Sequence, residues 1–431
     1  MPPVAIDSLL ATRPSDAATQ LASKIHDLEM RVKEERKAIT KSVDEKALNA
    51  TRVSLRDKYR ELIEVDIAHA TRLKCDEQMW KFVFYHRIDD VKKRLATLSA
   101  SLQEPTKQQR AEAALQELRT TLKAWAEDSK AFYASMLAWI LPACGLKLEG
   151  FLHGELAGTG RIGDPPPSAA QAGASEEGRK VMVTMCYKFL ICIGDLERYK
   201  QTHCAAGLSL GKDWSVAAAH YRAAGRLIPS EGHHWNQLGV IAQFEGDHFL
   251  NLYCHARSGL SEAPFARNSD NVLALLTRVE QLVTDTGGDP PRPTDKEGRC
   301  RRFYPRFVHL VGMLYHGSDL NSYKANEEEV LIELHSLLDL DTIDPRTLTK
   351  MAACCIWAAA EVESHPPSGD SRRCSDFARG LCCHLFSKVS VVARGTPDSP
   401  LLATLGVLCD WAFHDARLLR DAPPPPHGAD A

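Results

Sequence analysis

The stretch VMVTMCYKFLICIGDLERYKQ, residues 181–201, joins a long apolar segment to a charged end. Its apolar residues run without the polar alternation of a half-buried strand and over too great a length for a buried one, which predicts a buried α-helix. The last turns carry Asp195, Arg198 and Tyr199 within GDLERYK, residues 194–200. Such a cluster at the end of a buried helix indicates either a binding site or an ion pair of Arg198 with Asp195 or Glu197.

The same helical period continues through most of the chain. Long charged amphipathic patterns cover 21–39 and 55–98, and apolar helical patterns return after residue 300. Strand-like alternation with β-branched residues is scarce. The sequence therefore predicts an all-α fold.

Composition limits the function. The 431 residues suffice for two or three domains, and 53 Lys plus Arg against 56 Asp plus Glu leave a net charge of −3. We therefore do not expect a nucleic-acid or membrane partner, and any charged recognition must be local. The start of the chain lacks the pattern of a signal peptide, and no apolar run is long enough to span a bilayer. We expect a soluble cytoplasmic protein that could also shuttle to the nucleus.

Neither cysteines nor motifs indicate a metal, a cofactor or catalysis. Most of the 13 cysteines lie in apolar helical segments without zinc-ligand spacing, so we expect reduced core residues. Phosphate-cradling glycine loops and the GxSxG and HExxH motifs are missing, and nothing after residue 300 reads as a parallel sheet. The sequence predicts a protein without catalytic residues, metal or cofactor.

Composition also marks domain limits. A Gly/Pro/Ala/Ser-rich stretch at 154–178 predicts a mobile, dispensable loop. The expected parts are a flexible N-terminus at 1–16, a first domain at 17–283, a linker at 284–299, a helical-hairpin domain at 300–421 and a disordered tail at 422–431.

One internal repeat signal lies within 213–264. Small and aromatic residues there occupy the offsets where one tetratricopeptide repeat ends and the next begins. The residues that carry this pattern are Ala217, Tyr221, Ala224, Pro229, Trp235, Leu238 and Gly239. Generic helical-hairpin packing is the alternative explanation.

Several motifs together resemble a known family. They are GDLERYKQ, the block AAAHYRAAGRLIPSEGHHWNQLGVIAQFEGDHFLNLYCHARS, the segment APFARNSDNV, the pair Met79-Trp80, and RRFYPRFVHLVGMLYH at 301–316. In this order they resemble the adaptor family of nonsense-mediated mRNA decay, which includes the yeast "ever shorter telomeres" protein. The resemblance covers roughly residues 20–420.

The resemblance implies a 14-3-3-like helical domain with tetratricopeptide-like hairpins. In such domains a groove binds phosphoserine or phosphothreonine of partner proteins. Arg198 would be the phosphate fork, because guanidinium groups bind phosphate bidentately, and the Tyr199 hydroxyl would be a second donor. Asp195 would orient a basic neighbour. We then expect charge reversal at Arg198 to abolish phosphopeptide binding without a loss of stability.

The second half of this pocket departs from the family pattern. Phosphate-binding members carry a lysine five residues after the tryptophan of the Met-Trp pair. Counted from Trp80, that position is Tyr85, which has no positive charge. Lys81, four residues earlier, and Lys92, seven residues later, are expected on the same face and are candidate substitutes. Each could instead belong to a solvated basic surface.

Loss of the pocket lysine resembles the members that act as heterodimer partners of a phosphate-binding paralogue. The implied partners are that paralogous decay adaptor and the phosphorylated RNA helicase of the pathway, bound directly or through the paralogue. A phosphatase is a further partner that the resemblance allows. The alternatives are a tetratricopeptide-type scaffold for unphosphorylated peptides and a telomerase-associated relative.

Overall fold

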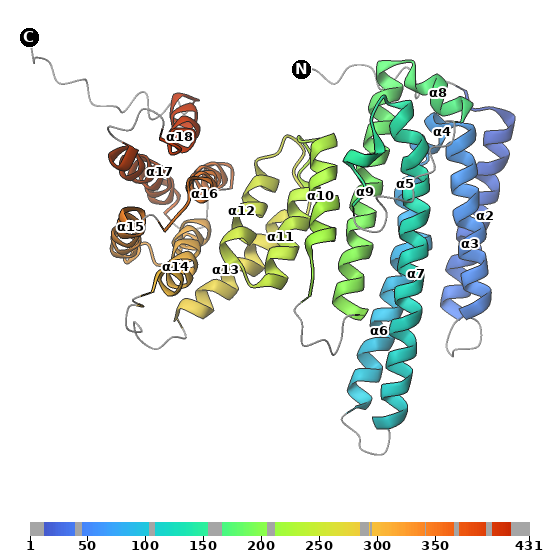
Figure 1. The fold of residues 1–431 in the computed structure, drawn as a ribbon, viewed down its shortest axis with the longest axis horizontal. Helices are drawn as coiled ribbons and strands as arrows, with labels where there is room; N and C mark the ends of the chain where they lie inside the picture. Colours follow the sequence, from blue (N-terminus) through green and yellow to red (C-terminus); the bar gives the residue numbers. More distant parts are fainter. Residues whose placement is uncertain are drawn as a thin grey trace, which may run out of the picture. The chain divides into compact units, whose positions relative to one another are not determined.

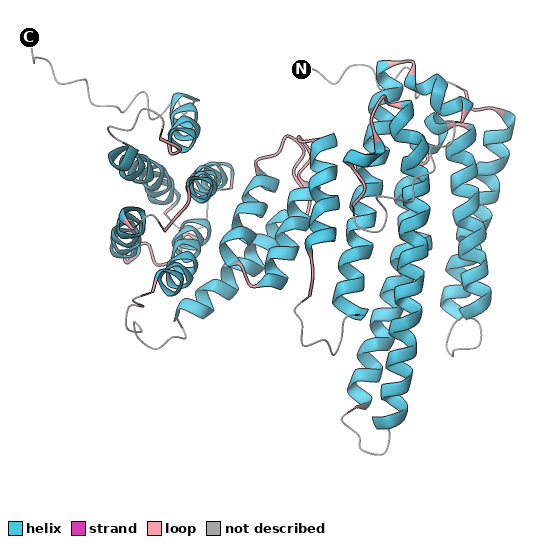
Figure 2. Ribbon diagram, viewed as in Figure 1, coloured by secondary structure: helices cyan, strands magenta, loops and turns pink. Residues whose placement is uncertain are grey.

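The computed structural model consists of helices, which confirms the all-α prediction (Figure 1, Figure 2). The only β-type contact among the described residues is an isolated bridge between Glu231 and Ala263. Two compact units divide the chain after Pro229. The structure describes residues 13–38, 45–102, 108–153, 166–204, 212–284, 293, 295–340, 342–365, 370–393 and 399–414. Over these ranges no helix has the length and hydrophobicity to cross a membrane.

The first unit comprises helices that run from α2 to α10. Their bounds are α2 Asp16–Ala38, α3 Glu45–Val65, α4 Ile67–Arg72, α5 Cys75–Met79, π-helix η1 Trp80–Tyr85, α6 His86–Ser101, α7 Gln108–Ala143, 3-10 helix η2 Leu148–Gly150, α8 Pro167–Gly173, α9 Glu176–Cys204 and α10 Ser215–Leu227. In α9 every residue from Phe189 to Arg198 is buried, because the helix packs against both α7 and α10. The apolar segment of 181–201 is therefore a central core helix, as predicted.

Helix η1 changes the angular register of the chain just before α6. Its hydrogen bonds skip one more residue than those of an α-helix, so a spacing of four residues no longer completes a turn. Phe84 of η1 lies against Tyr133 of α7, with ring centroids 4.9 Å apart, and Tyr133 lies 5.2 Å from Phe189 of α9. This aromatic packing holds η1 on the core while its register shifts.

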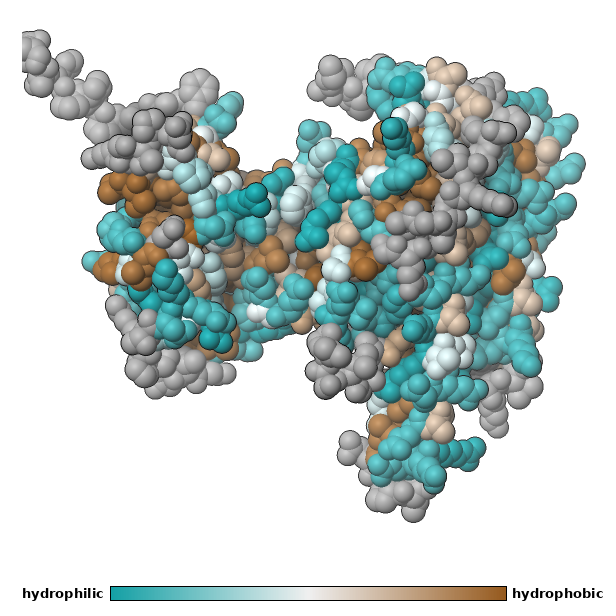
Figure 3. All heavy atoms as spheres, in the orientation of Figure 1, coloured by the Kyte–Doolittle hydropathy of each residue, from teal (hydrophilic) through white to brown (hydrophobic). Residues whose placement is uncertain are grey.

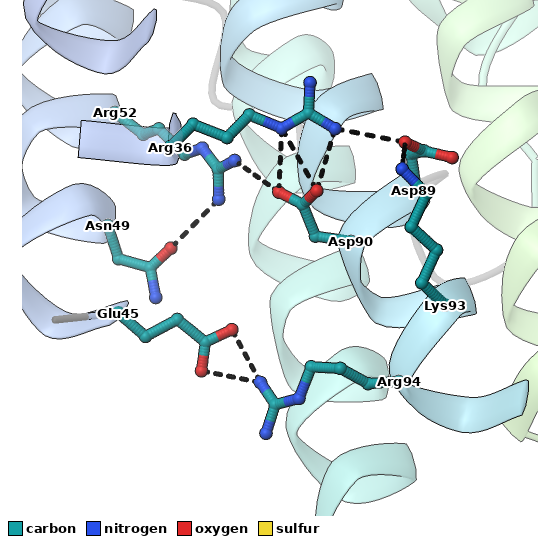
Figure 4. A network of polar contacts seen from close by, with 8 residues as sticks. All are labelled: Arg36, Glu45, Asn49, Arg52, Asp89, Asp90, Lys93 and Arg94. Atoms are coloured by element: carbon teal, nitrogen blue, oxygen red, sulfur yellow. Dashed lines mark hydrogen bonds and ion pairs between the residues drawn. The ribbon is translucent and has the colours of Figure 1, made fainter. Parts of the chain in front are cut away.

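A network of ion pairs ties α6 to α2 and α3 (Figure 4). Asp90 of α6 accepts hydrogen bonds from Arg36 of α2, at 2.8 Å, and from Arg52 of α3, at 3.0 Å. Arg52 is only 4% exposed, so its charge depends on this carboxylate. Glu45 at the start of α3 adds a bond of 2.6 Å to Arg94. The network fixes the helix that carries Lys92.

The prediction of a mobile loop at 154–178 is wrong for residues 167–178. Residues 167–173 form α8, which packs against α3, α7 and α9, and residue 176 already belongs to α9. Ala169 and Ala172 are buried, and the Ser168 hydroxyl donates a hydrogen bond to the carbonyl of Glu64. Small residues that suggested a loop instead permit close packing, since a Cβ at Gly173 would lie 2.3 Å from the carbonyl oxygen of Ala143. Residues 154–165 lie outside the described part.

The second unit comprises the remaining helices. Their bounds are α11 His233–Glu245, α12 His248–Gly259, α13 Asn268–Thr284, α14 Lys296–His316, α15 Tyr323–Asp339, α16 Pro345–Ser364, α17 Ser371–Ala393 and α18 Leu402–His414. Helices α11 and α12 pack as a hairpin, and a Cβ at Gly239 would lie 2.9 Å from Nε2 of His255. This close approach accounts for the small residue at that repeat position.

One continuous core crosses the expected linker at 284–299. Leu252 of α12 and Val272 of α13 belong to the same buried cluster as Phe303 and Phe307 of α14. The compact units divide after Pro229, which is not one of the limits drawn from composition. Those domain limits therefore stay a prediction. The expected flexible tail lies outside the described residues, as does most of the expected flexible N-terminus.

Apolar side chains are exposed on the last helices of the second unit. Ile332 of α15, Phe386 and Val391 of α17, and Leu402 and Val407 of α18 are among the exposed large hydrophobic residues. Figure 3 shows brown patches over this part of the unit. Exposed apolar surface of this kind is typical of contact surfaces.

Candidate binding site at the end of α9

The polar end of α9 forms a closed hydrogen-bond network with α10. Arg198 donates from Nη2 to Oδ1 of Asp195, at 3.0 Å, and from Nε to the hydroxyl of Tyr221, at 3.2 Å. The same hydroxyl donates to Oδ1 of Asp195, at 2.7 Å. All three residues are buried. The pKa of Arg198 is raised, because nearby Tyr221 and Asp195 more than offset the effect of burial.

Gly194 makes room for this network. A Cβ at Gly194 would lie 2.4 Å from Cε1 of Tyr221, so any other residue would push the ring of Tyr221 away from Asp195. In the sequence GD, Gly194 leaves space for the Tyr221 ring, and Asp195 is the acceptor that Tyr221 and Arg198 share. The sequence analysis did not assign a role to Gly194 and identified Tyr221 only as a repeat residue. A glycine inside an otherwise apolar helix was the feature that could have indicated a close contact.

Tyr199 lies at the outer side of this network. The guanidinium carbon of Arg198 is 4.4 Å from the centroid of the Tyr199 ring, and Nζ of Lys92 is 5.8 Å from it. The ring of His203 stacks on Tyr199 with centroids 6.2 Å apart. Burial, then Lys92, Lys212 and Arg198, lower the pKa of His203 to about 4. His203 is therefore neutral at pH 7. Arg198 and Lys92 are the cations that contact the ring of Tyr199.

Glu197 points to a different network. Lys130 of α7, which is 1% exposed, pairs with Glu197 and, at 2.5 Å, with Glu127. Lys200 bonds to the same two carboxylates at 2.8 and 2.9 Å. Two lysines and two glutamates balance one another, so this group adds no net charge to the site. Of the two expected ion-pair partners, Arg198 uses Asp195.

The candidate residues near Trp80 take different positions. Lys92 lies against Tyr199, and Tyr85 is 42% exposed and close enough to contribute to the raised pKa of Tyr199, whose largest cause is burial. Lys81 instead lies 5.3 Å from the ring of Phe82, which Lys33 of α2 also approaches, at 4.9 Å. The expectation that Lys81 and Lys92 share the face of Tyr85 is thus wrong for Lys81. The π-helical turn explains the difference, because it breaks the four-residue alignment.

The geometry defines a small cationic site with aromatic walls. It contains a buried, oriented guanidinium, one exposed ammonium group and tyrosine hydroxyls as neutral donors. Among the described residues, no group of His, Cys, Asp and Glu is arranged to hold a metal ion. Such a site can bind an anionic side chain of a partner.

The fold and this site define an all-α protein of 14-3-3-like type, and comparisons with known proteins identify its family. Residues 74–203 match the family model of the telomerase activating protein Est1. Residues 217–423 match the model of the Est1 DNA/RNA binding domain. The chain therefore belongs to the Est1 and nonsense-mediated decay adaptor family that its motifs indicated.

Curated relatives share about a quarter of the aligned residues. The chain is 24% identical over 237 residues to nonsense-mediated mRNA decay factor SMG7 of Danio rerio, which covers 53% of this chain and 17% of the relative. It is 25% identical over 244 residues to the SMG7-like factor of Arabidopsis thaliana, covering 56% and 23%. It is 26% identical over 277 residues to SMG5 of Danio rerio, covering 61% and 22%. These matches span less than a quarter of each relative.

Two solved structures have the same fold. The C. elegans SMG5-SMG7 complex matches with a TM-score of 0.54 and 14% identity, over 95% of this chain and 85% of that one. The structure of Est1 and Cdc13 matches with a TM-score of 0.65 and 15% identity, over 91% and 77%. At these identities the likeness supports the helical architecture alone.

Proposed function

We propose that the chain is a non-enzymatic adaptor of nonsense-mediated mRNA decay that pairs with a paralogous adaptor. In this proposal the pair engages the phosphorylated RNA helicase of the pathway, and the paralogue supplies the intact phosphate pocket. A phosphatase is a further candidate for recruitment. We place the protein in the cytoplasm, with passage through the nucleus.

Three findings support this proposal. Relatives named as decay factors align with more than half of the chain, and one solved structure of the same fold is a complex of two such proteins, SMG5 and SMG7. The observation that carries it is the site itself. Arg198 is oriented by Asp195 and Tyr221 as a recognition arginine would be, yet Tyr85 stands where phosphate-binding members carry lysine.

Pairing compensates for the weakened pocket. A missing charge-assisted hydrogen bond costs about 1.5 to 3 kcal/mol, or roughly a tenfold to hundredfold loss of affinity. A partner with an intact pocket restores the link to a phosphorylated target, because joining two weak sites in one particle raises the overall affinity.

Two alternatives remain. A tetratricopeptide-type scaffold for unphosphorylated peptides is favoured by the α11–α12 hairpin. A telomerase-associated relative is favoured by the match to the Est1 models. Neither alternative requires a second adaptor subunit.

Sedimentation velocity separates the adaptor from both alternatives. The chain is measured alone and mixed with its SMG5-type or SMG7-type paralogue, each at micromolar concentration. We expect a 1:1 heterodimer in the mixture. Independent sedimentation of the two proteins would contradict the proposal.

A further inference from the structure

We propose that the site around Arg198 binds the carboxylate of an aspartate or glutamate side chain in an unphosphorylated partner segment, in preference to a phosphate dianion. This inference rests on the proposed adaptor function and names what this subunit itself recognises. The residues that set the preference are Arg198, Asp195, Lys92 and Tyr85.

The charge of Arg198 is already balanced. Asp195 lies 3.0 Å from its Nη2, and both side chains are largely buried. In such surroundings the ion pair acts as a nearly neutral unit that still offers directed donors. Its bonds to Tyr221 and Asp195 use Nε and Nη2, and a guanidinium has five N–H donors in all.

Lys92 is then the uncompensated cation in contact with the Tyr199 ring. It forms no ion pair within the described part of the chain and lies over the ring of Tyr199. His203 is neutral at pH 7. Lys212, which helps to lower the pKa of His203, has its Nζ 5.8 Å from the centroid of the Trp214 ring. The Lys130, Lys200, Glu127 and Glu197 group is balanced internally. The groups that contact the Tyr199 ring therefore carry about one net positive charge, and Lys212 is a further cation on the side of His203.

One positive charge matches a carboxylate better than a phosphate. A carboxylate brings one negative charge, whereas a phosphoserine brings about 1.5 to 2 at pH 7. A bound dianion would leave negative charge uncompensated beside the buried Asp195, which is costly where water is excluded. The hydroxyls of Tyr199 and Tyr85 can donate to a carboxylate without adding charge.

Degenerate peptide libraries test this preference. Three fluorescent 11-residue libraries are compared that differ only in a fixed central glutamate, phosphoserine or serine. At pH 7.5 we expect the glutamate library to bind the full chain at least as tightly as the phosphoserine library, and the serine library to bind about tenfold more weakly. Tighter binding of phosphoserine, or equal binding of all three libraries, would overturn the proposal.

Tyr85→Lys provides a gain-of-function variant. Tyr85 is exposed, so the change leaves the core intact. We expect it to tighten binding of the phosphoserine library by about tenfold and to reverse the preference. Thr97→Lys, at an exposed position of the same helix but on a different face from Lys92, adds the same charge away from the site and should leave the preference unchanged. An equal effect of both variants would overturn the proposal, because it would show a nonspecific charge effect.

Acidification gives an independent readout. The second pKa of a phosphate is about 6, so a phosphoserine library becomes monoanionic between pH 7.5 and 5.5, whereas glutamate stays ionised. His203, with a pKa of about 4, remains neutral in this window. We expect phosphoserine binding to tighten by roughly tenfold and glutamate binding to stay constant. Weaker phosphoserine binding at pH 5.5 would contradict the charge argument.

Heterodimer formation is measured separately, so either outcome leaves the pairing proposal testable by itself.

Discussion

The hydroxyl of Tyr221 donates a hydrogen bond of 2.7 Å to Oδ1 of Asp195, the same oxygen that accepts Nη2 of Arg198 at 3.0 Å. One carboxylate oxygen thus joins α9 to α10 and orients Arg198, the arginine of the proposed binding site. The same three side chains stabilise the fold and form the proposed binding site. This sharing decides what substitutions at the site will do.

Charge reversal at Arg198 is expected to destabilise the protein, unlike the outcome expected from the sequence alone. Arg198→Glu places a second carboxylate beside the buried Asp195, which should lower the free energy of unfolding by about 3 kcal/mol. Lys92→Glu is the matched control, because Lys92 is exposed and should affect peptide binding without affecting stability. Chemical denaturation of both variants measures this. Equal stability of Arg198→Glu and the natural protein would show that Arg198 is independent of the core.

Gly194→Ala tests the space that Tyr221 requires. The added methyl group would overlap the Tyr221 ring, and overpacking of this kind costs about 1–3 kcal/mol. Gly380→Ala, within α17, is the control, because a Cβ there meets no atom within 4 Å and alanine favours a helix. We expect opposite changes in melting temperature for the two variants. In a Tyr221→Ala background the cost of Gly194→Ala should largely vanish.

Helix α8 is expected to be required for full stability. Replacement of residues 167–173 with a Gly/Ser segment of equal length removes the buried methyl groups of Ala169 and Ala172 and disrupts the bond from Ser168. About 0.8 kcal/mol per methyl group and 1 kcal/mol for the hydrogen bond give a loss of about 2–3 kcal/mol. Urea denaturation checks this, with Ser168→Ala as the smaller step. Unchanged stability would restore the loop interpretation.

Buried histidines are expected to make the fold acid-sensitive. Burial lowers the pKa of His220 and of His255 to about 4. An unfolded histidine has a pKa near 6.5, so the unfolded chain binds more protons between these values and stability falls as pH drops from 6.5 to 4. Each histidine contributes at most about 3 kcal/mol to this loss. Urea denaturation of His220→Gln across this range should show a flatter profile than the natural protein. An unchanged profile would mean that His220 titrates normally.

The sequence predicted the helical fold and the core position of 181–198 because apolar periodicity carries that information directly. It also predicted Arg198 and Tyr199 at one site, since adjacent residues at a helix end remain close in any packing. Lys92 was a candidate for the same pocket through the family resemblance, but periodicity alone could not predict its contact with Tyr199, because that contact depends on how η1 and α6 are placed against α9. The position of Lys81 was wrong because periodicity does not reveal a π-helical turn. Alanine and glycine in 167–173 gave the pattern of a loop, yet they form a closely packed helix.

Binding of the phosphoserine and glutamate libraries to the heterodimer tests the proposed division of labour most directly. The complex is formed once with the natural chain and once with its Lys92→Glu variant. We expect both complexes to bind the phosphoserine library with equal affinity, because the paralogue supplies that pocket, and the variant to lose binding of the glutamate library. Loss of phosphoserine binding with unchanged glutamate binding in the variant complex would contradict this division between the two subunits.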